Sequence, residues 1–218
     1  MAAPASVTIK DLSGTFYLVN PPLCARYTLK SLGQNYTHKT NSLPPPSQNK
    51  TLSDDPDPVL ALQGVSWITR TAISLATIYL NIKQYKDDAG VVHIDIEQTT
   101  TGGLQGTTEL RTLNWEKHDH EDYIFGKVHG QTRFANADAI DEAYLKEGWL
   151  EGDEEKGGPA GELHIQSHVE AEAGWTADMI WGFAEIDGER RYTRRVIVKK
   201  GDTVLKVRLI YDYYVQAA

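Results

Sequence analysis

The segment IYLNIKQYKDDAGVVHIDIE, Ile78 to Glu97, decides the fold class. On either side of KDDAG, apolar side chains occupy every second position, which is the pattern of a half-buried β-strand. The Asp and Gly residues of KDDAG are typical of a tight turn, so the segment predicts a β-hairpin. Short runs of the same kind follow at intervals of about ten residues, as far as TVLKVRLIYDYY, Thr203 to Tyr214. The sequence therefore predicts an antiparallel meander.

Closure of this meander follows from its two edges. A row of eight or more short strands leaves two edges without partners, and closure into a barrel removes both. We therefore predict an all-β, closed antiparallel barrel of about ten strands, in a single domain that spans residues 1–218. A β-sandwich is the alternative geometry.

Two segments interrupt the strands. Residues 51–76 have apolar side chains near helical spacing, so they predict two short helices separated at Gly64, which would cover one mouth of the barrel. Ser53, followed by two aspartates, is the expected N-cap of the first helix. Residues 136–161 predict a short helix and then an acidic, Gly-rich loop outside the barrel.

Composition excludes several classes of protein. The 218 residues carry a formal net charge of -8, which argues against a general nucleic-acid surface. No apolar run is long enough to span a bilayer, and MAAPASVTIK at the start lacks the pattern of a signal peptide, so we expect a cytoplasmic protein. The single cysteine, Cys24, excludes an intramolecular disulfide framework and a Cys-rich metal site.

The stretch from Val19 to Gln48 follows neither secondary-structure period and contains the sequences PP and PPP. It begins with valine, whose codons all start with GT, and ends with glutamine, which has the codon CAG. These are the terminal dinucleotides of an intron. Two explanations stay open: a retained intron translated in frame, or an irregular surface loop.

The strand GTFYL, Gly14 to Leu18, precedes a helical segment that contains GVSWITRTA, Gly64 to Ala72, and strands follow. This order resembles the intracellular lipid-binding proteins of the fatty-acid-binding kind, within the calycin superfamily, and also fungal proteins described as lipocalin-like. The resemblance implies an up-and-down barrel with a helix-turn-helix lid and a hydrophobic ligand inside.

The same resemblance implies that two arginines and a tyrosine on late strands hold a ligand carboxylate. By position, Arg194 or Arg195 matches the first arginine, and Arg208 with Tyr211 is the nearest equivalent of the rest. Arg208 and Tyr211 are three residues apart, so in a regular strand they would face opposite sides.

Other polar residues have two interpretations each. Glu97, Glu109 and Arg111 lie in strands expected to line the barrel, where a buried carboxylate can act as a general acid or base, or they are ordinary solvated charges. The sequence HDHED, His118 to Asp122, is a solvated hairpin tip or, less readily, part of a metal site. The polar face His164 to Glu170 is a cavity wall or an outer face.

The predicted function is binding of a small hydrophobic, acidic ligand inside the barrel. The alternative is a cofactor-independent cyclase or isomerase that acts on a hydrophobic metabolite through shape and a few polar groups. Neither interpretation requires a metal, a cofactor or a macromolecular partner. The residues predicted to contact the ligand, including two tryptophans that would line an apolar pocket, are Arg111, Arg195, Arg208, Tyr211, Trp115, Trp181 and Glu97.

Overall fold

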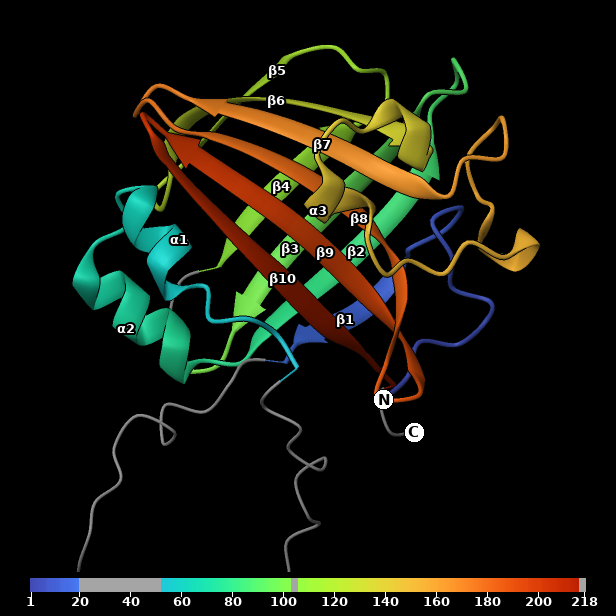
Figure 1. Ribbon diagram of the computed structural model, residues 1–218, viewed down its shortest axis with the longest axis horizontal. Helices are drawn as coiled ribbons and strands as arrows, with labels where there is room; N and C mark the ends of the chain where they lie inside the picture. Colours follow the sequence, from blue (N-terminus) through green and yellow to red (C-terminus); the bar gives the residue numbers. More distant parts are fainter. Residues whose placement is uncertain (20–51, 103–105, 216–218) are drawn as a thin grey trace, which may run out of the picture.

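The computed structural model describes residues 1–19, 52–102 and 106–215, and ten strands in these ranges form one antiparallel sheet that curves into a barrel (Figure 1). Residues 20–48 of the Val19 to Gln48 stretch lie outside the described residues, so both explanations for it stay predictions. The strands are β1 (Gly14–Leu18), β2 (Ile78–Lys86), β3 (Val92–Thr100), β4 (Thr107–Thr112), β5 (His118–Asp122), β6 (Gly126–Ala135), β7 (His164–Ala171), β8 (Thr176–Ile186), β9 (Glu189–Lys200) and β10 (Thr203–Tyr214).

The order of strands in the sheet is β4-β3-β2-β1-β10-β9-β8-β7-β6-β5. The first strand pairs with the last, with Phe16 opposite Tyr213, and this pairing brings the two ends of the chain together in the sheet. The edges β4 and β5 are not hydrogen-bonded to each other, so the barrel is nearly closed, with one gap between them. The prediction of an all-β antiparallel barrel of about ten strands is confirmed, with the barrel nearly closed.

Side chains on the inner face form two clusters along the barrel. We call the first the packed half; it joins residues of the N-terminal segment to the rings and isoleucines of the strands, namely Ile9, Leu12, Phe16, Ile94, Ile96, Ile165, Trp181, Phe183 and Tyr192. We call the second the lid half, and it consists of Val59, Val128, Val169, Trp175, Ala177, Val196, Val198 and Val207.

The lid is a pair of helices, α1 (Asp57–Leu62) and α2 (Trp67–Leu75), at one end of the barrel (Figure 1). The chain turns between them at Gly64, whose φ of 89° favours glycine. Arg70 ties the two helices together, because its Nε donates to Asp57 Oδ1 at 2.9 Å and its Nη1 donates to the Val65 carbonyl at 2.9 Å. The predicted two-helix lid is confirmed.

The predicted start of the first helix at Ser53 is wrong. The Ser53 hydroxyl donates to the Ile210 carbonyl at 3.3 Å and accepts from the Ile210 amide at 2.9 Å. Asp54 also bonds β10, through its amide to the Arg208 carbonyl and its carboxylate to the Arg208 amide. The segment therefore extends along β10, and α1 begins only after Pro56, where a proline is compatible with a first helical turn.

Residues 136–161 lie on the outer side of the barrel as a short layer. They contain the 3-10 turns η2 (Ala137–Ala139) and η3 (Asp153–Glu155) and the helix α3 (Ala143–Lys146). The layer covers β8 and β9, where Leu145 packs against Ile180 and Ile197. Polar contacts hold the helix in place, with Lys199 Nζ donating to Glu142 Oε1 at 2.7 Å.

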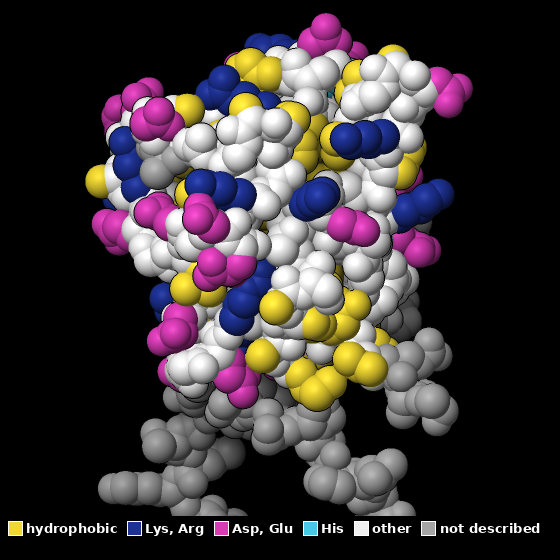
Figure 2. All heavy atoms as spheres, turned by 90° about the vertical axis from the view of Figure 1, so that its right-hand side faces the viewer, with side chains coloured by type: hydrophobic (Ala, Val, Ile, Leu, Met, Phe, Trp, Pro, Cys, Tyr) yellow, Lys and Arg dark blue, Asp and Glu magenta, His cyan; other side chains and the backbone are white. Residues whose placement is uncertain are grey.

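At the end of the barrel opposite to the lid, lysine and arginine side chains alternate with aspartate and glutamate (Figure 2). This face therefore has no extended field of one sign. Within the ranges that the structure describes, no helix is both long enough and apolar enough to cross a membrane.

Candidate functional site: a cavity above a polar belt

A cavity of about 240 Å³ lies within the lid half of the barrel. Residues of α1 and α2, among them Leu60 and Ile73, form its roof. Its walls are mainly apolar and are formed by Leu18, Ile78, Leu80, Phe125, Val128, Val169, Trp175, Ala177, Met179, Val196, Val198, Val207 and Leu209. Such a space suits a small hydrophobic molecule that displaces water from apolar surface.

The floor of the cavity is polar. On β9, Tyr192 belongs to the packed half and Val196 to the lid half, and Arg194 lies between them on the same face. We call the polar residues at this level the polar belt; its members are Gln98, Glu109, Arg111, Arg194 and Tyr211, all of which line the cavity. The belt therefore separates a filled part of the barrel from a hollow part.

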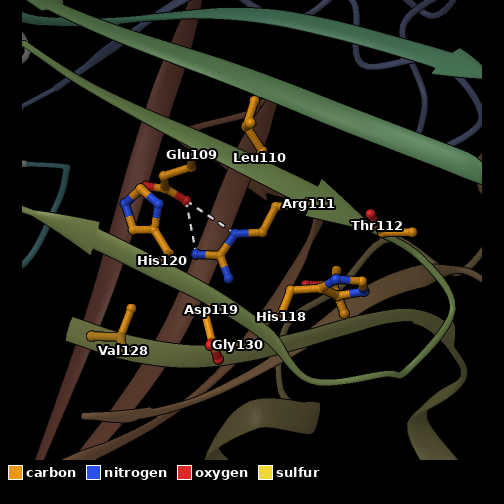
Figure 3. Close-up of a pocket in the computed structure, with 10 residues that line it drawn as sticks. Glu109, Leu110, Arg111, Thr112, His118, Asp119, His120, Val128 and Gly130 are labelled. Atoms are coloured by element: carbon orange, nitrogen blue, oxygen red, sulfur yellow. Dashed lines mark hydrogen bonds and ion pairs between the residues drawn. The ribbon is translucent and has the colours of Figure 1, made fainter. Parts of the chain in front are cut away.

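Glu109 is the centre of the hydrogen-bond network in the belt (Figure 3). Arg111 donates to its Oε2 from Nη2 at 2.9 Å and from Nε at 3.3 Å, and Gln98 donates to its Oε1 at 2.6 Å. Arg111 also reaches β7, where its Nη1 lies 3.4 Å from Ser167 Oγ. Arg111 is thus held on several sides by protein groups.

The electrostatics of Glu109 are decided by its neighbours. Burial opposes the charged form and would raise its pKa, but the positive charges of Arg111 and Arg194, together with the hydrogen bond from Arg111, outweigh burial and lower the pKa. Glu109 is therefore an anion at neutral pH, which makes it a poor general acid.

Arg194 is the least satisfied member of the belt. Its side chain is only 6% exposed, and its guanidinium lies 4.1 Å from the centre of the Trp181 ring and 5.5 Å from that of Tyr211. Nε donates to Tyr192 Oη at 3.0 Å, whereas Nη2 is buried and has no hydrogen-bond partner among the described residues. Burial alone would lower the pKa of Arg194, but the nearby tyrosines and Glu109 raise it, so the charge is permanent.

A glycine on the facing strand makes room for the belt. A Cβ atom at Gly130 of β6 would lie 2.9 Å from Arg111 Nη1, closer than such atoms approach in proteins. The absence of a side chain at this inward position is therefore what allows Arg111 to extend toward Ser167.

The gap between β4 and β5 opens beside the belt. A small cavity of about 30 Å³ lies there, and its lining includes Glu109, Arg111 and His120 (Figure 3). The interpretation of HDHED as a hairpin tip is wrong, because it forms β5, and His120 and Asp122 also line the main cavity. Among the described residues, no group of three or more His, Cys, Asp or Glu side chains is arranged to hold a metal.

The structure divides the residues predicted to contact a ligand. Arg111 and Tyr211 line the cavity, and Trp181 lies beneath Arg194. The remaining four do not line it. Arg195 donates to the Tyr144 carbonyl of the outer layer at 3.0 Å. Arg208 and Glu97 lie on the outer face of their strands, because the residues on either side of them point inward. Trp115 stacks with Arg133.

Sequence reasoning did not commit to Arg194, and it missed Gln98 and His120 as members of the site. The signal for Arg194 was its position two residues from Tyr192 and Val196, so that it shares one face of β9 with these residues and with Val198. Gln98 could be recognised in the same way, because it shares one face of β3 with Ile94 and Ile96.

The fold is an antiparallel ten-stranded β-barrel with a two-helix lid, and fatty-acid-binding proteins share this fold. A Schistosoma mansoni fatty acid binding protein, solved in complex with arachidonic acid, has a TM-score of 0.50 and 13% identity to this chain, and the match covers 96% of this chain and 99% of that chain. At this level of identity the likeness concerns the fold.

Two fungal relatives are much closer in sequence, although no family model matches the chain. The probable pericyclase scpY of Mollisia scopiformis is 31% identical over 192 residues, which are 87% of this chain and 93% of the relative. The pericyclase pydY of an Acremonium species is 31% identical over 169 residues, or 76% and 87% of the two chains. The chain belongs to the family of these fungal pericyclases.

Proposed function

We propose that the protein binds a small hydrophobic molecule in the lid half, with an oxygen-bearing, acidic end on the polar belt. The observation that carries this proposal is Arg194, a buried guanidinium at the floor of an apolar cavity. A buried cation is costly without an acceptor, and the belt has two guanidinium groups for one carboxylate. An anionic or strongly accepting oxygen supplies the missing partner.

In this proposal Arg194, Arg111 and Tyr211 contact the polar end of the ligand, and Trp181 supports Arg194 from the packed half. Arg195, Arg208, Glu97 and Trp115 are left out, because they do not line the cavity. A cytoplasmic location is also part of the proposal, and it rests on the sequence alone.

Displacement of a fluorescent probe tests binding. Anilinonaphthalene sulfonate is bound to the protein and then displaced by a long-chain fatty acid or by its methyl ester. We expect the acid to displace the probe roughly ten-fold more strongly, since only the acid gains a charge-assisted hydrogen bond of about 1.5 kcal/mol or more.

A space-filling variant locates the site. Ala177 is buried and lines the cavity, so Ala177→Phe should abolish probe binding. Ala89→Phe, at the exposed tip of the β2–β3 turn, is the matched control and should bind the probe like the wild type. Equal binding in both variants would place the ligand outside the barrel.

A second candidate function is catalysis of a pericyclic ring closure, and the two pericyclases at 31% identity favour it. The cavity suits such a reaction, because a folded substrate held between apolar walls loses the entropy that opposes ring closure before the reaction begins. Binding and catalysis would use the same space, so the two candidates do not exclude each other.

Replacement of pydY in the Acremonium host by this chain separates the candidates. A pericyclase should restore a cyclised product with the same mass as its linear precursor, and Ala177→Phe should lose this product while Ala89→Phe keeps it. If the protein is present and binds the precursor but forms no ring, it is a binding protein.

A further inference from the structure

The two arginines of the belt differ in what they have left to donate. Arg111 uses Nε and Nη2 on Glu109 and Nη1 on Ser167, so all three of its nitrogens face protein acceptors. Arg194 uses only Nε, on Tyr192 Oη. A guanidinium has five N–H groups, and Nη2 of Arg194 carries two of them that no described residue accepts.

The surroundings of Arg194 keep it rigid. It lies between the rings of Trp181, Tyr192 and Tyr211, with 4.1 Å to the nearest ring centre. Stacked rings and the bond to Tyr192 hold the guanidinium plane in one orientation without consuming its terminal N–H groups. This arrangement is a preorganised donor at the bottom of an apolar space.

We propose that Arg194 is the residue that hydrogen-bonds and polarises an oxygen conjugated with the reacting double bonds of the substrate, and that the substrate class is accordingly an unsaturated carbonyl compound with an apolar body. This inference deepens the proposed function and rests on it. Glu109 and Arg111 are positioning residues, since they contact each other and keep the belt in place.

The chemistry requires no proton donor or oxidant. In a closure between a diene and an alkene of one molecule, three π bonds become two σ bonds and one π bond, so the product is an isomer of the substrate. Electron density moves toward the carbonyl oxygen when the alkene is conjugated with it. A fixed cation at that oxygen stabilises the transition state more than the ground state, and Arg194 gives up no proton.

Prodan, a small naphthyl ketone, tests the inference directly. Its emission moves to longer wavelength when its carbonyl accepts a hydrogen bond. We expect Prodan in the wild-type cavity to emit at longer wavelength than in Arg194→Met, and to bind at least ten-fold more weakly to this variant. Arg195→Met is the matched control, because the next residue of the same strand faces the outer layer and not the cavity.

The Prodan and fatty-acid measurements distinguish failure of this inference from failure of the proposed function. Identical Prodan emission in the wild type and in Arg194→Met overturns the inference and leaves the binding function intact. Loss of fatty-acid binding in Arg194→Met with unchanged Prodan emission makes Arg194 a carboxylate site and also overturns it. If neither Prodan nor anilinonaphthalene sulfonate binds the wild type, the proposed function fails and the inference fails with it.

The test does not depend on the folding of a variant. With an isotope label in the carbonyl group of Prodan, the infrared band of the bound ketone can be recorded on the wild-type protein. We expect this band at lower frequency than in a hydrocarbon solvent. A band at the position of a carbonyl without a hydrogen bond contradicts the inference.

Discussion

The packed half and the lid half of the barrel are built on the same strands and differ in the size of their inward side chains. On β8, Trp181 and Phe183 belong to the packed half, whereas Ala177 belongs to the lid half. On β9, the contrast is between Tyr192 and Val198. Rings fill the width of one half, whereas the other half, apart from Trp175, is built from valine and alanine side chains that leave it hollow. The cavity is thus a consequence of side-chain volume at alternate positions of regular strands.

The comparison also explains why the polar belt lies where it does. Phe16 and Tyr192 pack with ring centres 5.1 Å apart, and Phe183 and Tyr192 with centres 5.9 Å apart, so the packed half gives the belt a rigid base. On the other side the belt faces the cavity. The packed half therefore orients the guanidinium of Arg194, and a ligand in the cavity supplies its hydrogen-bond partner.

The largest effect should come from a truncation in the packed half. Phe16 is fully buried, and Phe16→Ala should lower the free energy of unfolding by about 3–5 kcal/mol, because it leaves a void among rings. In the lid half, Val207→Ala enlarges a cavity that already exists, so it should cost about 1 kcal/mol. Urea unfolding of both variants measures the difference. Equal losses would mean that the two halves are packed alike.

The next effect concerns His164, on the outer side of β7 beneath the insertion. It is fully buried against Trp149, neither ring nitrogen has a hydrogen-bond partner among the described residues, and burial lowers its pKa from 6.5 to about 4. The unfolded chain binds a proton below pH 6.5 and the folded protein only near pH 4. Stability is therefore complete above pH 6.5 and falls as the pH drops toward 4, by about 3 kcal/mol in all.

Unfolding experiments at several pH values test this contribution. The variant His164→Leu should lose the part of the pH dependence between 6.5 and 4, while the groups that titrate in both proteins, His168 among them, cancel in the comparison. If the wild type and the variant change in parallel over this range, the imidazole is not held neutral by the outer layer.

Sequence patterns predicted the strands well and the absolute direction of their side chains less well. Alternation correctly placed Arg208 and Tyr211 on opposite faces, but it does not say which face is inside. On β9 both faces carry apolar residues, because Ile197 is buried under α3 while Val196 lines the cavity. Whether Arg194 or Arg195 faces the cavity therefore depends on which face of β9 residues 136–161 cover, and the sequence of β9 alone does not show this.

The prediction of a hairpin tip at HDHED failed because charge alone does not distinguish a turn from an edge strand. A run of histidines and acids suggests a solvated turn, yet β5 is the last strand of the sheet, and charged side chains are common on such an edge. The lid was easier to predict, since Gly64 and the helical spacing are local signals. The cavity could not be predicted from local signals, because its shape depends on which volumes meet across the barrel.

A smaller effect is expected at the border between the halves. Gly130→Ala brings a Cβ to 2.9 Å from Arg111 Nη1, and Arg111 cannot swing away freely because Glu109 and Ser167 hold it. We expect a loss of about 1–2 kcal/mol in unfolding free energy. The double variant Gly130→Ala with Arg111→Met should recover most of the steric part. Additive losses in this double-mutant cycle would show that the two positions do not interact.

The smallest effect on stability should come from the lid, which has to open for a ligand to enter or leave the lid half. The Arg70–Asp57 ion pair joins α1 to α2 at 2.9 Å, but the Asp57 side chain is 42% exposed, so Asp57→Asn should cost less than about 1 kcal/mol. The pair nevertheless holds the roof of the cavity, whereas nothing comparable has to open in the packed half. We therefore expect anilinonaphthalene sulfonate to leave Asp57→Asn faster than the wild type in stopped-flow experiments, with little change in unfolding. Lys117→Ala breaks an exposed pair with Glu170 that involves neither lid helix, and it is the control, with an unchanged release rate. If the release rates of all three proteins agree, the probe leaves by another route, and the gap between β4 and β5 becomes the exit to examine.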